Sequence, residues 1–254
     1  MEFRVKKRFA NKVAIITGAG QGMGKQVAID MSKEGAKVVA VDIEKSKVDE
    51  VEREIRKEKN ECIAIKCDIS SREEVDGMIQ KTINTYGKID ILVNNAGLLT
   101  TGNIEDVTDE LIDKTLDINL KGPLYAIRSV TPIMKKNKYG RIINVSSITA
   151  KRGDNTTVFV YGASKGALMT VTKSVARELG PFGITSNAVA PHAIMTKMMS
   201  YWDEDKKRNA AEKIPVKRLG TVQDVSNLIM FLSSEDASFI NGETININGG
   251  YYMD

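Results

Sequence analysis

The chain has 254 residues, of which 42% are hydrophobic and 28% charged, proportions that exclude a disordered or fibrous protein. Its formal net charge is +4, and the densest basic run, between Arg4 and Arg8, is too short for a nucleic-acid footprint. No apolar run approaches the roughly 18 residues of a membrane helix, and no apolar signal-peptide segment follows the basic start. We therefore expect a cytoplasmic protein that binds neither nucleic acid nor membranes.

Short apolar segments rich in β-branched residues alternate with longer helical patterns along the chain. Such segments are typical of strands buried on both faces of a parallel sheet. The seven expected strands cover residues 13–16, 38–41, 62–65, 89–93, 141–145, 185–189 and 243–247. Helices are expected over 24–33, 45–59 and 73–85, and near 105–135 and 161–180. This order predicts an α/β fold, Rossmann-like and doubly wound, with a parallel seven-stranded sheet and helices on both faces. One domain over residues 12–254 is expected, after a poorly ordered tail over 1–11.

The two cysteines, Cys62 and Cys67, occupy positions of opposite parity in one expected strand. Their side chains should point to opposite faces of the sheet, so they are expected to be buried free thiols. With a single histidine in the chain, they make a poor set of zinc ligands, and no metal site is expected.

The first expected strand ends in a glycine-rich turn, Thr17-Gly-Ala-Gly-Gln-Gly-Met-Gly24, that leads directly into a helix. Glycines let the backbone approach a pyrophosphate closely, and the helix N-terminus offers free N–H groups and a positive dipole. The spacing is not that of the G-x-G-x-x-G fingerprint, and tight strand-to-helix turns use glycine in any case. The turn alone is therefore a weak indication of a dinucleotide site.

The second expected strand ends in Asp42, 20 residues after Gly22. An acidic side chain at this place can accept hydrogen bonds from the adenosine ribose hydroxyls and repel a 2′-phosphate. The sequence therefore predicts NAD rather than NADP, although Lys45 could soften the discrimination. Asp42 could equally be a helix N-cap, and the two roles are compatible. Asp68 follows the third strand, and Asn94-Asn-Ala-Gly97 follows the fourth, where both would lie beside the cofactor.

From Lys12 to about Gly250 the chain resembles the short-chain dehydrogenase/reductase family. The motifs that carry the resemblance are the glycine-rich turn, Asp68, Asn94-Asn-Ala-Gly97, Asn119, Ser146-Ser147, Tyr161-Gly-Ala-Ser-Lys165 and Asn187-Ala-Val-Ala-Pro191. Each motif is weak alone, but in this order and at these strand ends they are specific together. Tyr161 and Lys165 also make chemical sense alone, because residues four apart share a helix face and a nearby ammonium lowers the pKa of a phenol.

The resemblance implies a hydride transfer between NAD(H) and a secondary alcohol or ketone, with four catalytic residues. Tyr161 would exchange the proton with the substrate oxygen, which Ser147 would hold. Lys165 would lower the phenol pKa and bind the nicotinamide ribose, and Asn119 would hold a water that passes protons to solvent. The implied cofactor contacts are Gly18, Gln21, Gly22, Met23, Asp42, Ile43, Asp68, Ile69, Asn95, Ala96, Gly97, Tyr161, Lys165, Pro191, Ile194 and Thr196. The family also implies a homotetramer.

Two departures from the family pattern concern the substrate side. The catalytic serine usually lies thirteen residues before the tyrosine, which here is Ile148, so we assign Ser147, with Ser146 as the fallback. His192 stands where the family usually has glycine. It is either a loop residue that tolerates an unusual backbone angle or an imidazole near the substrate with a charge switch near neutral pH.

Residues 193–215 are expected to form a substrate lid. Met195, Met198, Met199 and Trp202 follow helical spacing, so they either bury a short helix or adapt to an apolar substrate. The expected substrate contacts are Ser147, Tyr161, His192, Met198 and Trp202. Few Arg or Lys side chains in the expected substrate region could bind a carboxylate or phosphate, so an uncharged and fairly apolar substrate is expected. The alternatives are a 3-oxoacyl thioester reductase, which Asp42 argues against because such enzymes usually prefer NADPH, and an NAD-sensing module without chemistry.

Overall fold

The computed structural model describes residues 7–153, 157–196 and 202–254. Among these residues, seven parallel strands form one sheet in the order β3-β2-β1-β4-β5-β6-β9. The strands are β1 (Val13–Thr17), β2 (Lys37–Asp42), β3 (Cys62–Lys66), β4 (Ile91–Asn94), β5 (Gly140–Val145), β6 (Ile184–Pro191) and β9 (Thr244–Ile247). The predicted doubly wound parallel sheet is confirmed.

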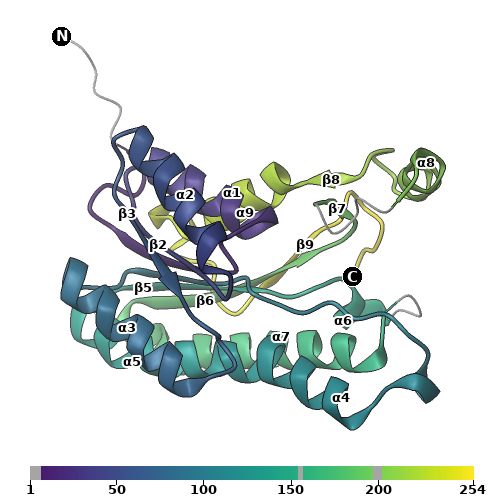
Figure 1. Cartoon of the computed structure of the whole chain (residues 1–254), viewed down its shortest axis with the longest axis horizontal. Coiled ribbons are helices and arrows are strands. Elements are labelled where there is room, and N and C mark those ends of the chain that lie inside the picture. Colours follow the sequence, from purple (N-terminus) through teal and green to yellow (C-terminus); the bar gives the residue numbers. More distant parts are fainter. Residues whose placement is uncertain (1–6, 154–156, 197–201) are drawn as a thin grey trace.

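Helices cover both faces of this sheet (Figure 1). One face carries α1 (Gly22–Lys33), α2 (Lys45–Lys57) and α9 (Val222–Leu232), and the other carries α3 (Arg72–Tyr86), α5 (Gly122–Asn137) and α7 (Phe159–Leu179). Alternate residues of each strand enter different cores: Ala14 and Ile16 join the first, Val13 and Ile15 the second. This division explains why β1 and β2 are almost wholly apolar, since side chains of both parities are buried in one core or the other.

The two cysteines follow the same alternation. Cys62 packs in the first core and Cys67 in the second, and both are free thiols. Burial raises the pKa of each thiol to about 12. The prediction of buried, unpaired cysteines is confirmed, and neither thiolate is available at neutral pH.

The predicted helical region near residues 105–135 is divided into several elements. A 3₁₀ turn, η1 (Ile104–Asp106), precedes α4 (Asp109–Leu116), and a π-helical turn, η2 (Asp117–Lys121), joins α4 to α5. Such π-turns are often found at functional sites, and this one contains the buried Asn119. Hydrophobic periodicity does not reveal it, because one extra residue shifts the helical register only locally.

The expected N-terminal tail is partly docked. Phe9 is 1% exposed and belongs to the first core, and its amide donates to the Glu34 carbonyl at 2.9 Å. Residues 7–11 therefore pack against the end of α1, contrary to the expectation of a loose tail up to residue 11. The basic residues around Phe9 are typical of a solvated tail, but this single apolar side chain anchors the segment in the core.

The expected lid contains a short strand, β7 (Ile194–Met195), and a helix, α8 (Glu204–Glu212). Met195 pairs with Thr221 of β8 (Gly220–Thr221), so it is not part of a helical stripe, and that expectation is wrong at this position. Met198 and Met199 lie outside the described residues. Trp202 is half-buried just before α8, and no described residue accepts a hydrogen bond from its buried indole N–H.

The close packing of the glycine-rich turn can be tested with a glycine substitution. A Cβ on Gly24 would lie 2.2 Å from the Gly18 carbonyl oxygen and 2.4 Å from Asn95 Nδ2, so Gly24→Ala should lower the free energy of unfolding by about 1–3 kcal/mol. The control is Gly77→Ala in α3, where a Cβ meets nothing within 4 Å. This control should raise the free energy of unfolding by about 0.5–1 kcal/mol, because alanine is the better helix former. Urea titration would measure both, and an unchanged Gly24→Ala variant would contradict the packing described here.

Candidate active site

Strand order reverses at β1, which has β2 on one side and β4 on the other. The chain continues from β1 to α1 on one face of the sheet and from β4 towards α5 on the other (Figure 1). Ligands of such sheets bind at the carboxyl ends of the strands, at this point of reversal. The glycine-rich turn follows β1 and Asn95 to Gly97 follow β4, while Ser146 and Ser147 follow the neighbouring β5. The motifs singled out in the sequence therefore meet at one edge of the sheet.

The glycine-rich turn is held in shape by Thr17 and Asn95. Asn95 Nδ2 donates to the carbonyls of Thr17 and Gly18, at 2.9 and 3.1 Å. Thr17 Oγ1 accepts from the amides of Asn95 and Ala96, at 3.0 and 3.1 Å. Gly18 has φ +63°, and a Cβ on it would lie 2.8 Å from Ala96 Cα. Asn95 and Ala96, expected as cofactor contacts, thus also shape the turn, and the sequence analysis missed the role of Thr17.

The N-terminus of α1 is open to a ligand. No described side chain caps its first N–H groups, and Gly22 with Thr196 helps to line a cavity of about 470 Å³. The nearest atom to a Cβ on Gly22 would be Thr196 Cγ2 at 3.7 Å. Met23 packs partly against the first core. Free N–H groups and the helix dipole suit the pyrophosphate of a dinucleotide, so the residues here fit the implied cofactor.

Asp42 lies against the same turn. Its Oδ2 accepts from the Gly20 amide at 3.0 Å and its Oδ1 from the Glu44 amide at 3.1 Å. The N-cap of α2 is Glu44, so the N-cap alternative for Asp42 is wrong. Ile43, beside it, is 55% exposed. Asp42 keeps the position expected for a group that meets the adenosine ribose, and it also fixes the glycine turn.

The cation beside this turn is Lys47 rather than Lys45. Lys45 forms an ion pair with Asp49 on the same helix. Lys47 Nζ contacts Glu44 Oε1 at 2.5 Å and Gln21 Oε1 at 3.4 Å. Its charge is therefore shared with an adjacent carboxylate.

Asp68 and Ile69 lie in the loop between β3 and α3. Asp68 Oδ1 accepts from the amide and the hydroxyl of Ser70, at 2.9 and 2.6 Å. Ile69 is buried, and its side chain lies 2.9 Å from where a Cβ on Gly122 would be. Ile69 thus packs closely on Gly122, and contact of this loop with the adenine stays a prediction.

Asn119 binds the loop after β4. Its Oδ1 accepts from the Leu98 amide at 2.7 Å, and its Nδ2 donates to the Leu98 carbonyl at 2.9 Å and to Ser164 Oγ at 3.2 Å. The side chain is buried and committed to these partners. Both side-chain N–H groups of Asn119 are thus used, so a relay water would bond to its backbone or to the second lone pair of Oδ1.

Ser147, Tyr161 and Lys165 come together as expected. Tyr161 is hydrogen bonded to Ser147, whereas Ser146 Oγ donates to the Lys165 carbonyl at 2.8 Å and ties β5 to α7. The geometry therefore favours Ser147 over Ser146. Lys165 Nζ donates to the Val145 carbonyl at 2.8 Å and lies 3.2 Å from where a Cβ on Gly97 would be. A side chain at position 97 would crowd this ammonium.

The pKa values in this cluster follow burial more than pairing. Burial raises the pKa of Tyr161, and the hydrogen bond with Ser147 partly lowers it. Burial also lowers the pKa of Lys165 to about 8. The pKa of the phenol responds here to burial and to Ser147, while the Lys165 ammonium donates to the Val145 carbonyl. The expected action of Lys165 on the phenol stays a prediction.

The remaining expected contacts follow β6. Pro191 ends that strand, and its carbonyl accepts from the Ile148 amide at 3.1 Å, next to Ser147. His192 donates its amide to the Ile247 carbonyl at 3.2 Å, and its ring stacks on Tyr251. Ile194 is buried in β7, and Thr196 faces Gly22.

Comparison with known proteins places this geometry in a family. Residues 18–252 match the family model described as enoyl-(acyl carrier protein) reductase. A 3-oxoacyl-[acyl-carrier-protein] reductase of Staphylococcus epidermidis is 39% identical over 96% of this chain and 100% of its own length. The chain belongs to the short-chain dehydrogenase/reductase family. It is accordingly an oxidoreductase that acts on CH–OH or C=O groups.

Two further members of the family resemble this one. The (2S)-[(R)-hydroxy(phenyl)methyl]succinyl-CoA dehydrogenase subunit BbsD of Thauera aromatica is 36% identical over 94% of this chain and 96% of its own. The solved structure of a protein described as a short-chain alcohol dehydrogenase of Sinorhizobium meliloti superposes with a TM-score of 0.91. It is 32% identical, and the match covers 97% of this chain and 98% of that one.

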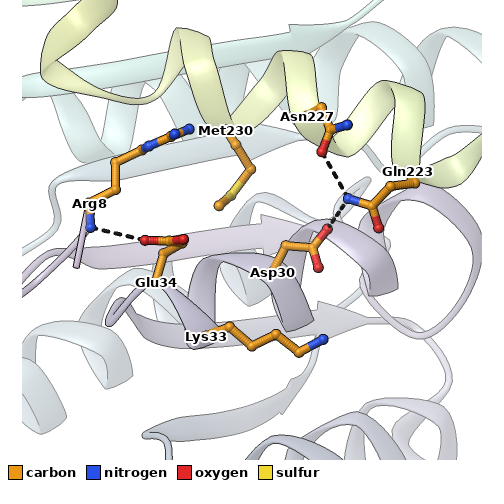
Figure 2. Close-up of a pocket in the computed structure, with 7 residues that line it drawn as sticks. All are labelled: Arg8, Asp30, Lys33, Glu34, Gln223, Asn227 and Met230. Carbon is orange, nitrogen blue, oxygen red and sulfur yellow. Dashed lines mark hydrogen bonds between the residues drawn. The ribbon is translucent and has the colours of Figure 1, made fainter. Parts of the chain in front are cut away.

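A second cavity of this dehydrogenase/reductase has a structural explanation. Figure 2 shows it between α1 and α9, lined by Arg8, Asp30, Lys33, Glu34, Gln223, Asn227 and Met230. Asp30 Oδ2 accepts from Gln223 Nε2 at 2.9 Å and from Ser226 Oγ at 2.7 Å. These bonds join the two helices, so we assign the cavity no ligand.

No described helix is long and apolar enough to cross a membrane, and no described acidic, His or Cys side chains gather into a possible metal site.

Proposed function

We propose that this enzyme transfers a hydride between NAD(H) and a secondary alcohol or its ketone. The observation that carries the proposal is that Ser147 acts on Tyr161 as a hydrogen-bond partner that lowers the pKa of the phenol, while the buried Lys165 ammonium donates to the Val145 carbonyl at the end of β5. The bound nicotinamide would supply or accept the hydride. The residues that would hold the cofactor are those of the glycine turn, Asp42, Asn95 to Gly97, and Thr196.

The residues of the chain would handle the proton. Tyr161 would give its proton to the substrate oxygen in reduction and remove it in oxidation, while Ser147 orients that oxygen. Lys165, next to Gly97, would contact the nicotinamide ribose and favour the phenolate as it forms. Asn119 would hold the Leu98 loop in place. It would also bind the water that passes protons to solvent.

The preference for NAD would depend on Asp42. A 2′-phosphate would meet its carboxylate, whose two oxygens are fixed by the Gly20 and Glu44 amides. We expect Asp42→Asn to raise the ratio of kcat/KM for NADP to that for NAD at least tenfold, or about 1.4 kcal/mol. Glu50→Gln, at an exposed position of α2, is the control and should leave the ratio within threefold. An unchanged ratio in Asp42→Asn would assign selectivity to other groups, Lys47 first.

A second candidate substrate class comes from the relatives. The Staphylococcus protein is named for reduction of a 3-oxoacyl thioester, and BbsD for dehydrogenation of a hydroxyacyl-CoA. In both names the reacting carbon belongs to an acyl thioester. This dehydrogenase/reductase would then take a 3-oxoacyl or 3-hydroxyacyl thioester rather than a simple ketone.

One assay separates these possibilities. Uncharged secondary alcohols and ketones, and acetoacetyl-CoA as the thioester probe, would be tested with NAD(H) and NADP(H) in parallel. Faster turnover of the simple compounds with NAD(H) supports the proposal. Faster turnover of acetoacetyl-CoA supports the thioester candidate, and dinucleotide binding with no turnover of either class would favour a sensing module.

We also propose that the enzyme is a homotetramer. Support comes from large apolar side chains left exposed on the helices expected to pair, namely Leu124 on α5 and Phe159 on α7. Sedimentation at micromolar concentration tests this, and a monomer would contradict it.

A further inference from the structure

The C-terminal segment after β9 (residues 248–254) folds back to the substrate side of the site. Asn248 organises it: its Nδ2 donates to the Tyr252 carbonyl at 2.8 Å, and its Oδ1 accepts from the Gly250 amide at 2.9 Å. Gly249 and Gly250 have φ +62° and +85°, a sharp turn that requires glycine. A Cβ on Gly249 would lie 2.6 Å from both Ile214 and Val216, so the turn packs closely under the end of the lid.

The end of the segment is tied to the loop after β5. Asp254 forms an ion pair with Lys151 of α6 (Thr149–Arg152) and accepts from Asn246 Nδ2 at 2.6 Å. Lys151 Nζ also donates to the Thr244 carbonyl at 3.4 Å. The segment is therefore fastened at both ends and holds Tyr251 between them.

Tyr251 stacks between two other segments. The His192 ring lies on the Tyr251 ring with centroids 3.9 Å apart and an angle of 14° between the planes. The Arg152 guanidinium lies 5.0 Å from the centroid of the same ring. Aromatic stacking and cation–π contacts of this kind restrict the orientation of the side chains that make them.

This stack adjoins the catalytic group. Pro191, one residue before His192, accepts the hydrogen bond of the Ile148 amide, one residue after Ser147. Arg152 lies on the helix that begins two residues beyond Ser147. His192 and Arg152, which contact Tyr251, are therefore both on segments next to Ser147, the serine expected to hold the substrate oxygen.

We propose that Tyr251 is a positioning residue that sets substrate specificity. Tyr251 covers one face of His192 and so fixes the orientation of the imidazole. The imidazole would then present a flat surface beside Ser147, and this surface would contact the substituent next to the ketone's carbonyl group. A planar, unsaturated substituent such as an aryl group makes close contact with such a surface, and a methyl group does not. The inference rests on the proposed function and adds to it the class of ketone that the enzyme prefers.

The test compares a phenyl ketone with a small dialkyl ketone in wild-type enzyme and three variants. In Tyr251→Ala we expect kcat/KM for the phenyl ketone to fall about tenfold relative to the dialkyl ketone, mainly through KM. The KM for the dinucleotide should stay unchanged. Tyr251→Phe keeps the stacked ring and should keep the wild-type ratio. Met253→Ala, at a 76% exposed position of the same segment, is the matched control.

The outcomes separate this inference from the proposed function. An active wild type with the same ketone ratio in Tyr251→Ala would overturn the inference alone. An equal loss for both ketones, with a lower melting temperature, would also overturn it, because Tyr251 would then only stabilise the fold. A wild type inactive on both ketones and on acetoacetyl-CoA would overturn the proposed function, and the inference with it.

Discussion

Tyr161→Phe should lower kcat by roughly 10²–10⁴-fold while leaving the Kd for the dinucleotide nearly unchanged. The substitution removes only the hydroxyl that is hydrogen bonded to Ser147 and leaves the ring packed at the start of α7. The loss should be in kcat, because the proton moves in the chemical step. Steady-state kinetics in both directions, with dinucleotide binding measured separately, would check this.

The control is Tyr86→Phe, at the end of α3 and outside the site. It should keep wild-type kcat, whereas full activity in Tyr161→Phe would remove the basis of the proposed function. The pH profile gives a second check. Burial raises the pKa of Tyr161, so alcohol oxidation, which needs the phenolate, should accelerate as pH rises above neutral. Ketone reduction needs the phenol and should decline over the same range.

Lys165→Met should change how stability depends on pH. Burial lowers the pKa of Lys165 to about 8 from 10.5. Between these values the unfolded chain binds a proton that the folded chain does not, so this lysine makes stability rise with pH. From pH 7 to pH 10 the wild type should gain about 2–3 kcal/mol in free energy of unfolding relative to Lys165→Met, which lacks the titrating group.

Urea titrations of both proteins at pH 7 and pH 10 would measure this difference, with other titrating groups cancelling between them. Lys173→Met, on the same helix, is the matched control and should show no such difference. Equal pH dependence in wild type and Lys165→Met would show that the ammonium is better solvated than the structure indicates. Activity should fall in Lys165→Met at pH 7, because the buried charge beside Gly97 is lost.

Much of the site follows from local features of the sequence. Buried parallel strands have an uninterrupted apolar pattern, so the ends of β1, β2, β4 and β5 could be located, and functional groups of such sheets follow strand ends. The four-residue spacing of Tyr161 and Lys165 on a helix has the same local origin. The nucleotide end and the catalytic cluster were therefore predicted as a set of neighbouring loops.

Contacts between residues distant in sequence could not be predicted. The sequence placed Lys165 near Tyr161, but only the packing of α7 on β5 directs its ammonium to the Val145 carbonyl and leaves Ser147 as the partner that lowers the phenol pKa. Met195 had helical spacing, yet it pairs with β8, from a segment 26 residues later.

The contrast has one physical reason. Periodicity, turn chemistry and strand ends depend on neighbours along the chain, so the sequence by itself determined the α/β fold and the glycine turn and indicated the candidate catalytic residues. Hydrogen-bond partners, burial and ring stacking depend on which segments the fold brings together. Tertiary structure alone therefore decided the choice of Ser147 over Ser146, the docking of Phe9 and the meeting of His192 with Tyr251.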